Sequence, residues 1–96
     1  MKLTWNDEKA AKVKVEHKVE FKKLVDVFDD VFSVDFIDDE HSTDEETRYA
    51  VIGKTAQYGL IYLVYVSVSE NELKFITARK AEKWMVDFYR ESNAKH

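Results

Sequence analysis

The sequence predicts a single α+β domain with a largely antiparallel sheet, in the order β-α-α-β-β-β-β-α. Three observations support this fold class. Apolar residues recur at helical spacing before position 30, residues 31–78 are rich in β-branched and aromatic side chains, and residues 79–91 return to helical spacing. A chain of 96 residues that is 45% hydrophobic is long enough to enclose one core.

The first third of the chain is predicted to contain a short strand and two helices. Residues 3–5 fit a strand, and Asn6 is a favourable N-cap for a helix over residues 7–16, whose first turn is acidic. A second helix is expected within residues 19–30, because four apolar residues recur at i, i+3, i+4 and i+7. These are Phe21, Leu24, Val25 and Phe28.

The middle of the chain predicts four strands, over residues 31–37, 47–55, 59–68 and 73–78. Residues 61–66 are apolar on both faces, which is typical of a central strand covered on each side. Residues 38–46, DDEHSTDEE, have the composition of an exposed loop. The large aromatic residues expected in the core are Trp5, Phe28, Phe32, Phe75 and Trp84.

The last helix is predicted over residues 79–91. One face of it carries apolar side chains, namely Ala81, Trp84, Met85 and Phe88, with Tyr89 at the border. We therefore expect one domain over residues 1–93. Residues 94–96, which include His96, are expected to form a disordered tail.

The composition excludes several classes of function. The chain has no cysteine, so disulfides, a thiolate nucleophile and cysteine-ligated zinc are excluded. No apolar run approaches the roughly 18 residues of a membrane span, and the first residues lack the apolar core of a signal peptide. The sequence therefore predicts a cytoplasmic protein without membrane contact.

The charges are unevenly distributed along a chain whose net charge is −4. Residues 1–26 contain seven lysines and five acidic residues, residues 27–72 two basic and eleven acidic residues, and residues 73–96 six basic and three acidic residues. Exposed charges more than about 8–10 Å apart are largely screened at physiological salt. If folding brings the two basic ends together, this acidic chain can still present a local positive surface.

Short motifs in a fixed order along nearly the whole chain resemble one known family. The first are Trp5, Asn6, Lys9, Ala10, His17 and Phe21. The later ones are VFDD at residues 27–30, ETRY at 46–49, IG at 52–53, ITARKA at 76–81, and Tyr89. Their order and spacing are similar to those of the BrnT toxins of bacterial type II toxin–antitoxin systems, which have a RelE-like ribonuclease fold.

The resemblance implies a metal-independent endoribonuclease that cuts RNA, inhibits translation and needs no cofactor. It also implies a protein partner, a BrnA-type antitoxin whose ribbon-helix-helix domain binds operator DNA. This chain would then reach DNA only through the antitoxin. A toxin–antitoxin heterotetramer is expected on the same ground.

For the site, the resemblance implies cations that stabilise the charge developing on a phosphate. His17 is the candidate acid or base, because histidine transfers protons near neutral pH. The candidate catalytic residues are His17, Arg48, Arg79 and Lys80, and the candidate RNA-binding residues are Lys9, Lys54, Lys74 and Tyr89. Arg79 and Lys80 are expected at the N-terminus of the last helix, where free backbone N–H groups also attract an anion.

Simpler roles remain open for these residues. The cations are otherwise solvated surface charges, His17 could cap the C-terminal end of the first helix, and Tyr89 could serve in packing. The carboxylates and His41 of residues 38–46 could attract a divalent cation. That segment lacks the glycine and the ligand spacing of a calcium loop, so we expect no metal there.

The chain departs from the family pattern at three positions near the candidate site. Val13 stands where the family usually has Asn, Glu16 where it has Lys, and Lys18 where it has Gly. Glu16 places an anion beside His17. An alternative function is therefore a toxin-fold module that has lost cleavage and mainly binds its antitoxin.

Overall fold

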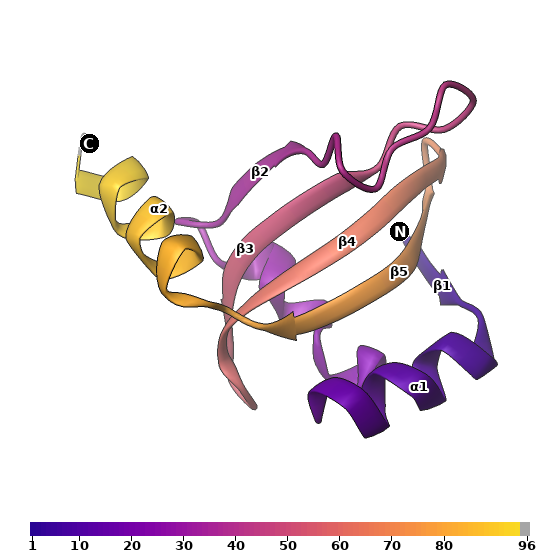
Figure 1. Ribbon diagram of the computed structural model, residues 1–96, viewed down its shortest axis with the longest axis horizontal. Coiled ribbons are helices and arrows are strands. Elements are labelled where there is room, and N and C mark those ends of the chain that lie inside the picture. Colours follow the sequence, from indigo (N-terminus) through magenta and orange to yellow (C-terminus); the bar gives the residue numbers. More distant parts are fainter. Residues whose placement is uncertain (95–96) are drawn as a thin grey trace.

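The computed structural model describes residues 1–94 (Figure 1). Its elements are β1 (Lys2–Trp5), α1 (Asp7–His17), the 3₁₀ helices η1 (Phe21–Lys23) and η2 (Val25–Asp29), β2 (Val34–Ile37), β3 (Tyr49–Thr55), β4 (Gly59–Ser69), β5 (Glu72–Lys80) and α2 (Lys83–Ala94). The predicted mixed α+β class is confirmed for this part of the chain, and so is the succession of five strands along the sequence. None of its helices has the length and apolarity that crossing a bilayer requires.

The strands formed by the described residues make one sheet, in the order β1-β5-β4-β3-β2. β1 and β5 are parallel, and the other neighbours are antiparallel. The predicted central strand is confirmed, because β4 lies in the middle. β1 pairs only with residues 72–75, so residues 76–80 of β5 have no strand on their outer side within residues 1–94. The candidate site lies along this free edge.

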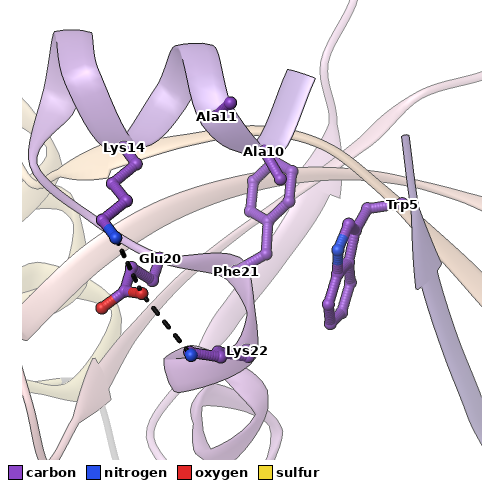
Figure 2. A pocket seen from close by; sticks show the side chains of 7 residues that line it. All are labelled: Trp5, Ala10, Ala11, Lys14, Glu20, Phe21 and Lys22. Atoms are coloured by element: carbon purple, nitrogen blue, oxygen red, sulfur yellow. Dashed lines mark ion pairs between the residues drawn. The ribbon is translucent and has the colours of Figure 1, made fainter. Parts of the chain in front are cut away.

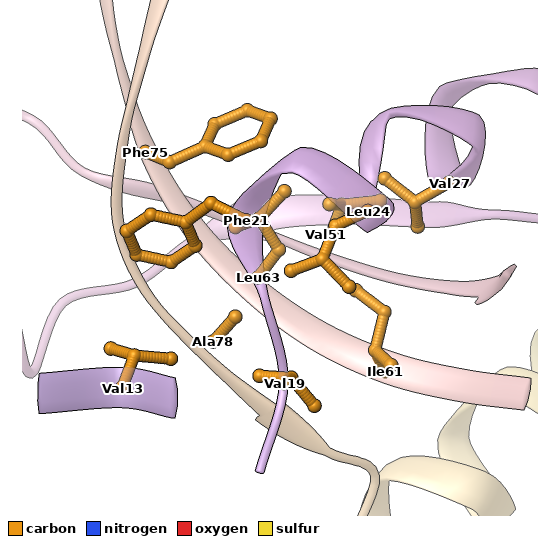
Figure 3. Packing of buried hydrophobic residues seen from close by; sticks show 10 residues of the cluster. All are labelled: Val13, Val19, Phe21, Leu24, Val27, Val51, Ile61, Leu63, Phe75 and Ala78. Atoms are coloured by element: carbon orange, nitrogen blue, oxygen red, sulfur yellow. The ribbon is translucent and has the colours of Figure 1, made fainter. Parts of the chain in front are cut away.

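Apolar side chains cover both faces of β4. Ile61 and Leu63 point to the face that carries α1, η1 and η2, where they join the core cluster drawn in Figure 3. Tyr62 and Val64 point to the opposite face, where they pack in a second cluster with Met85 of α2. Because neighbouring side chains in a strand alternate between faces, two cores require the continuous apolar run seen in the sequence.

α1 begins and ends with recognisable caps. The Asn6 side chain accepts hydrogen bonds from the backbone N–H groups of Glu8 and Lys9, at 2.9 and 3.1 Å, which confirms the predicted N-cap. Val13 is buried in the core, so this departure from the family pattern has a packing role. Lys18 ends the helix in the left-handed conformation with φ of 61°, a region that glycine adopts most readily.

The predicted second α-helix within residues 19–30 is wrong. The segment forms η1 and η2, with hydrogen bonds from the Leu24 N–H to the Phe21 carbonyl and from the Val27 N–H to the Leu24 carbonyl. This three-residue repeat buries Phe21, Leu24 and Val27 and leaves Val25 43% exposed.

Contacts with β3 explain why this segment forms tight turns. The Asp30 carboxylate accepts a hydrogen bond from the Lys54 backbone N–H at 2.8 Å, which ties the end of η2 to the strand. Gly53 allows η2 to approach closely, because a Cβ atom at Gly53 would lie 2.6 Å from Cγ2 of Val27. These tertiary contacts override the helical spacing of the apolar residues.

The prediction that the last helix begins at Arg79 is also wrong. β5 continues through Arg79 and Lys80, whose backbones pair with β4, and α2 begins only at Lys83. Of the predicted tail, Ala94 is the last residue of α2. Residues 95–96, with His96, lie outside the described residues.

The aromatic residues expected in the core divide into two groups. Phe75 is 1% exposed, and Trp5 and Phe28 pack against it in the cluster beneath α1. Phe32 and Trp84 are instead 55% and 49% exposed. Phe32 lies in the turn before β2 and Trp84 in the first turn of α2, so for these two residues the prediction is wrong.

Candidate functional site

A small hollow lies beside the free edge of β5, between the end of α1 and the connection from β2 to β3. We call that connection, residues 38–48, the 38–48 loop. The volume of the hollow is about 150 Å³. Its lining comes from α1, the 38–48 loop, β4 and β5 and consists of His17, His41, Tyr62, Thr77, Ala78 and Arg79. Segments that are distant in the sequence therefore meet here.

Asp38 is the buried anchor of the 38–48 loop, with 4% of its surface exposed. Its Oδ2 atom accepts a hydrogen bond from the Tyr62 hydroxyl at 2.7 Å and lies 2.7 Å from Nδ1 of His41. Its Oδ1 atom accepts a hydrogen bond from the His41 backbone N–H at 3.2 Å. The polar run therefore starts with a residue that is fixed to the centre of the sheet, although the sequence predicts an exposed loop.

These hydrogen bonds set the protonation of the cluster. Burial opposes a charge on Asp38, but hydrogen bonds from Tyr62 and His41 outweigh it and hold the pKa of Asp38 below its ordinary value. Burial, together with the hydrogen bond to the Asp38 carboxylate, raises the pKa of Tyr62. At neutral pH Asp38 is therefore an anion and Tyr62 a neutral donor.

Arg79 supplies the positive charge of the hollow. Its Cζ atom lies 5.5 Å from the centre of the Tyr62 ring, which is a cation–π contact. Its Nη1 atom lies 3.1 Å from Oε1 of Glu82, and its Nε is buried without an acceptor among residues 1–94. Since 39% of the side chain is exposed, Tyr62 holds the guanidinium in place while part of it stays accessible to an anion.

His17 is the last residue of α1, and its ring lines the hollow. Its Nε2 atom lies 3.9 Å from the Glu16 carboxylate. The last turn of the helix is closed by the Lys18 backbone N–H, which donates to the Lys14 carbonyl at 3.1 Å. Because the backbone provides this cap, the imidazole of His17 is free to face the hollow.

A second hollow continues from the first along α1. Its lining includes Lys9, Lys12 and Glu16 of α1 together with Ile76 and Thr77 of β5. Thr77 borders both hollows, and we call the two together the α1–β5 groove. Figure 1 shows α1 lying beneath β5. The expectation that the two basic ends of the chain meet is therefore confirmed for α1 and β5.

Arg48 is not among the residues that line the α1–β5 groove and directly precedes β3. Its Nε donates to Oε1 of Glu46 at 3.0 Å. Its backbone N–H donates to Oγ of Ser42 at 2.8 Å, and its carbonyl accepts from the Asp38 N–H at 2.8 Å. Arg48 therefore lies at the base of the 38–48 loop, and its backbone hydrogen bonds to Ser42 and Asp38 close the loop.

Four further candidates also lie outside the groove lining. They are Lys54, Lys74, Lys80 and Tyr89. Lys80 follows Arg79 in β5, so its side chain points to the opposite face of the sheet. The Tyr89 hydroxyl donates to the Asp30 carboxylate at 2.8 Å, which is a packing contact. Lys54 and Lys74 are exposed, the first on β3 and the second in the half of β5 that pairs with β1.

The predicted anion site at a helix N-terminus is wrong, because Arg79 and Lys80 belong to a strand. Their backbone groups are part of the sheet. Glu82 instead marks the start of α2, where its carbonyl accepts hydrogen bonds from the Met85 and Val86 N–H groups, each at 3.0 Å. An acidic residue in this place suits the helix dipole.

A larger and more apolar hollow of about 190 Å³ lies between α1 and η1 (Figure 2). Trp5 and Phe21 form part of its wall. Its charged residues pair with one another, since Glu20 lies 3.5 Å from Lys14 and 3.8 Å from Lys22. None of its lining residues transfers protons readily near neutral pH, so we place the candidate site in the α1–β5 groove.

Asp38, Glu40 and His41 bring one potential ligand atom each within 4.8 Å of one another. The Asp38 carboxylate is already engaged by Tyr62 and His41. A cation would have to compete with these hydrogen bonds, and exposed acidic groups often gather without one. We therefore assign no metal to this cluster.

Sequence reasoning missed Asp38, His41 and Tyr62 as members of one site. Tyr62 lies in the apolar run of β4 and resembles any other core residue, while Asp38 and His41 belong to a charged loop. One signal was available. A buried tyrosine in a central strand needs a hydrogen-bond partner for its hydroxyl, and the chain offers acidic residues directly after β2, which is separated from β4 by β3 alone.

Comparison with known proteins defines the class. The family model described as "Ribonuclease toxin, BrnT, of type II toxin-antitoxin system" matches residues 5–84. The ribonuclease toxin BrnT of Brucella abortus, known from a crystal structure, has the same fold, with a TM-score of 0.68 at 23% sequence identity over 86% of this chain and 99% of that chain. A comparison with curated protein sequences gives no match.

These findings identify a toxin of the type II toxin–antitoxin class, which implies an antitoxin as partner. The chain belongs to the BrnT family of ribonuclease toxins. The resemblance inferred from the motifs is thereby confirmed, with Trp5 and Trp84 at the two ends of the matched region.

Proposed function

We propose that this chain is a metal-independent endoribonuclease that cuts RNA in the α1–β5 groove. The observation that carries the proposal is that His17 and Arg79, from different parts of the chain, line one hollow. In the reaction the 2′-oxygen of RNA attacks the adjacent phosphorus, and the bond from phosphorus to the 5′-oxygen breaks. A base takes the proton of the 2′-hydroxyl, and an acid gives one to the leaving oxygen.

Four residues of the groove have a role in this proposal. The Arg79 guanidinium stabilises the negative charge that builds up on the phosphate oxygens. His17 transfers a proton at the same phosphate. Lys9 and Lys12 border the adjoining hollow, where they contact phosphates of neighbouring nucleotides.

The biological setting is proposed from the family resemblance. The toxin acts in the cytoplasm and inhibits translation, and its fold is RelE-like. Its partner is a BrnA-type antitoxin that contributes a ribbon-helix-helix domain, binds operator DNA and assembles with the toxin as a heterotetramer. The toxin reaches DNA only through this antitoxin.

Incubation of the purified chain with total RNA in the presence of EDTA tests the proposed activity. We expect internal cuts that leave 2′,3′-cyclic phosphate and 5′-hydroxyl ends. RNA that stays intact under these conditions would contradict the proposal. Cuts that disappear when EDTA is added would contradict its metal-independent part.

One observation supports a second function, a module that mainly binds its antitoxin. The Glu16 carboxylate lies 3.9 Å from Nε2 of His17 and brings negative charge to the groove that RNA would enter. Two results together would favour this second function. The parent chain would leave RNA intact while binding the antitoxin tightly, and a Glu16→Lys variant would cleave RNA.

A further inference from the structure

We propose that His41, oriented by Asp38, is the general base of this site and that His17 is its general acid; this inference rests on the proposed ribonuclease function. Both imidazoles line the same hollow as Arg79. RNA cleavage by the 2′-oxygen needs one group that accepts a proton and another that donates one. Two histidines beside one arginine therefore provide a proton acceptor, a proton donor and a cation for the phosphate.

The hydrogen bond to Asp38 determines which nitrogen of His41 can act. Nδ1 of His41 lies 2.7 Å from Oδ2 of an ionised Asp38, so the proton of the neutral ring sits on Nδ1. The Nε2 atom of His41 is then unprotonated and can accept the proton of the 2′-hydroxyl. The side chain of His41 is 39% exposed, which leaves the ring accessible to a substrate.

Asp38 and Tyr62 are positioning residues in this arrangement. Asp38 is buried, and both of its carboxylate oxygens accept hydrogen bonds from His41. The Tyr62 hydroxyl fixes the same carboxylate from β4, and the Tyr62 ring lies against Arg79. The base and the phosphate-binding cation are therefore held by one connected set of contacts.

The proposed step balances without a cofactor. Nε2 of His41 takes the proton of the 2′-hydroxyl as the bond between the 2′-oxygen and phosphorus forms. The protonated His17 ring gives its proton to the 5′-oxygen as the bond from that oxygen to phosphorus breaks. The products are a 2′,3′-cyclic phosphate and a 5′-hydroxyl, and proton exchange with water restores both rings.

Cleavage assays on His41→Gln and His17→Gln variants test the assignment. Each variant is expected to lose activity by roughly 10²- to 10⁴-fold, the usual contribution of general acid–base catalysis. Each variant is tested on an ordinary RNA and on a second RNA that carries sulfur in place of the 5′-oxygen at a mapped cleavage site. A sulfur leaving group needs no proton, so this RNA is expected to restore cleavage by His17→Gln but not by His41→Gln.

Asp38→Asn and Glu40→Gln distinguish the orienting role of Asp38 from metal binding. Asp38→Asn is expected to lower kcat with little change in KM, because the ring loses its orientation while the RNA still binds. Glu40→Gln is expected to cleave RNA at the parent rate, both in the presence and in the absence of EDTA. Circular dichroism on every variant confirms that the fold is retained.

Several results would overturn the inference. Cleavage by His41→Gln at the parent rate would do so, and so would restored cleavage by this variant on the sulfur substrate. Loss of activity in Glu40→Gln or in EDTA would show a metal site in place of the proposed pair. If the parent chain leaves all RNA intact, the proposed function fails first, and the inference falls with it.

Discussion

The hydroxyl of Tyr62 donates a 2.7 Å hydrogen bond to the carboxylate of Asp38. This bond joins the central strand to the first residue of the 38–48 loop and is buried on both sides. The Tyr62 ring also lies against the Arg79 guanidinium. A single side chain of the sheet therefore positions both the loop and the cation of the groove.

The Tyr62→Phe variant is expected to be less stable by about 1–3 kcal/mol, because it leaves part of the buried Asp38 carboxylate without a donor. Urea unfolding at neutral pH measures this loss. Tyr49→Phe, in the neighbouring strand β3, is the matched control. Equal losses in the two variants would contradict the importance of the hydrogen bond to Asp38.

The Tyr89→Phe variant tests a second tyrosine–carboxylate pair. Burial, followed by the hydrogen bond to Asp30, raises the pKa of Tyr89 from 10.0 to about 12. In the unfolded chain Tyr89 ionises from about pH 10, while in the folded chain it stays protonated. The contribution of Tyr89 to stability is therefore complete below pH 10 and is lost as the pH rises toward 12.

We expect the parent chain to be about 1 kcal/mol more stable than Tyr89→Phe at neutral pH. This difference narrows as the pH rises from 10 to 12. Denaturant unfolding across this range measures it, and comparison of the two chains cancels the ionisation of the lysines. A difference that widens with pH would contradict the assigned direction of the pKa.

Periodicity predicted most of the fold correctly. The apolar run of β4, which covers both faces of the strand, and the cap at Asn6 are local features, and both are confirmed. The segment around Val27 was mispredicted, because its turns depend on the approach allowed by Gly53. Arg79 was assigned to a helix because sequence spacing does not show how far a strand ladder extends.

The candidate site was only partly predictable. His17 and Arg79 were found through the family motifs, and the structure places them in one hollow. Asp38 and His41 were hidden in a run of similar charged residues, where composition does not show which carboxylate becomes buried. The hydrogen bond from Tyr62 determines that the Asp38 carboxylate is the buried one. This hydrogen bond depends on strand pairing between distant segments of the chain.

The Glu82→Gln variant is expected to bind RNA more tightly. Glu82 holds part of the Arg79 guanidinium through an exposed ion pair at 3.1 Å, which competes with a phosphate. Exposed pairs contribute about 0.2–1 kcal/mol, so the Kd is expected to fall by up to about fivefold. Fluorescence anisotropy with a 2′-O-methyl RNA measures it, and an equal effect of Glu91→Gln at the far end of α2 would contradict this explanation.

The Lys18→Gly variant is expected to be more stable by about 0.5–1 kcal/mol. Lys18 adopts a φ of 61° at the end of α1, which strains an ordinary residue but not glycine. Thermal and urea unfolding measure the change. Lys14→Gly, inside the same helix, is the matched control and is expected to lose about 1 kcal/mol. Destabilisation by both substitutions would contradict the assigned strain.

The most direct test compares RNA cleavage by the parent chain, Arg79→Ala and Arg90→Ala. Arg79 lines the groove, whereas Arg90 is an exposed arginine on α2. Removal of one donor that stabilises the transition state costs about 10²- to 10³-fold in rate. We predict this loss for Arg79→Ala and the parent rate for Arg90→Ala. Equal rates for the two variants would contradict cleavage in the α1–β5 groove.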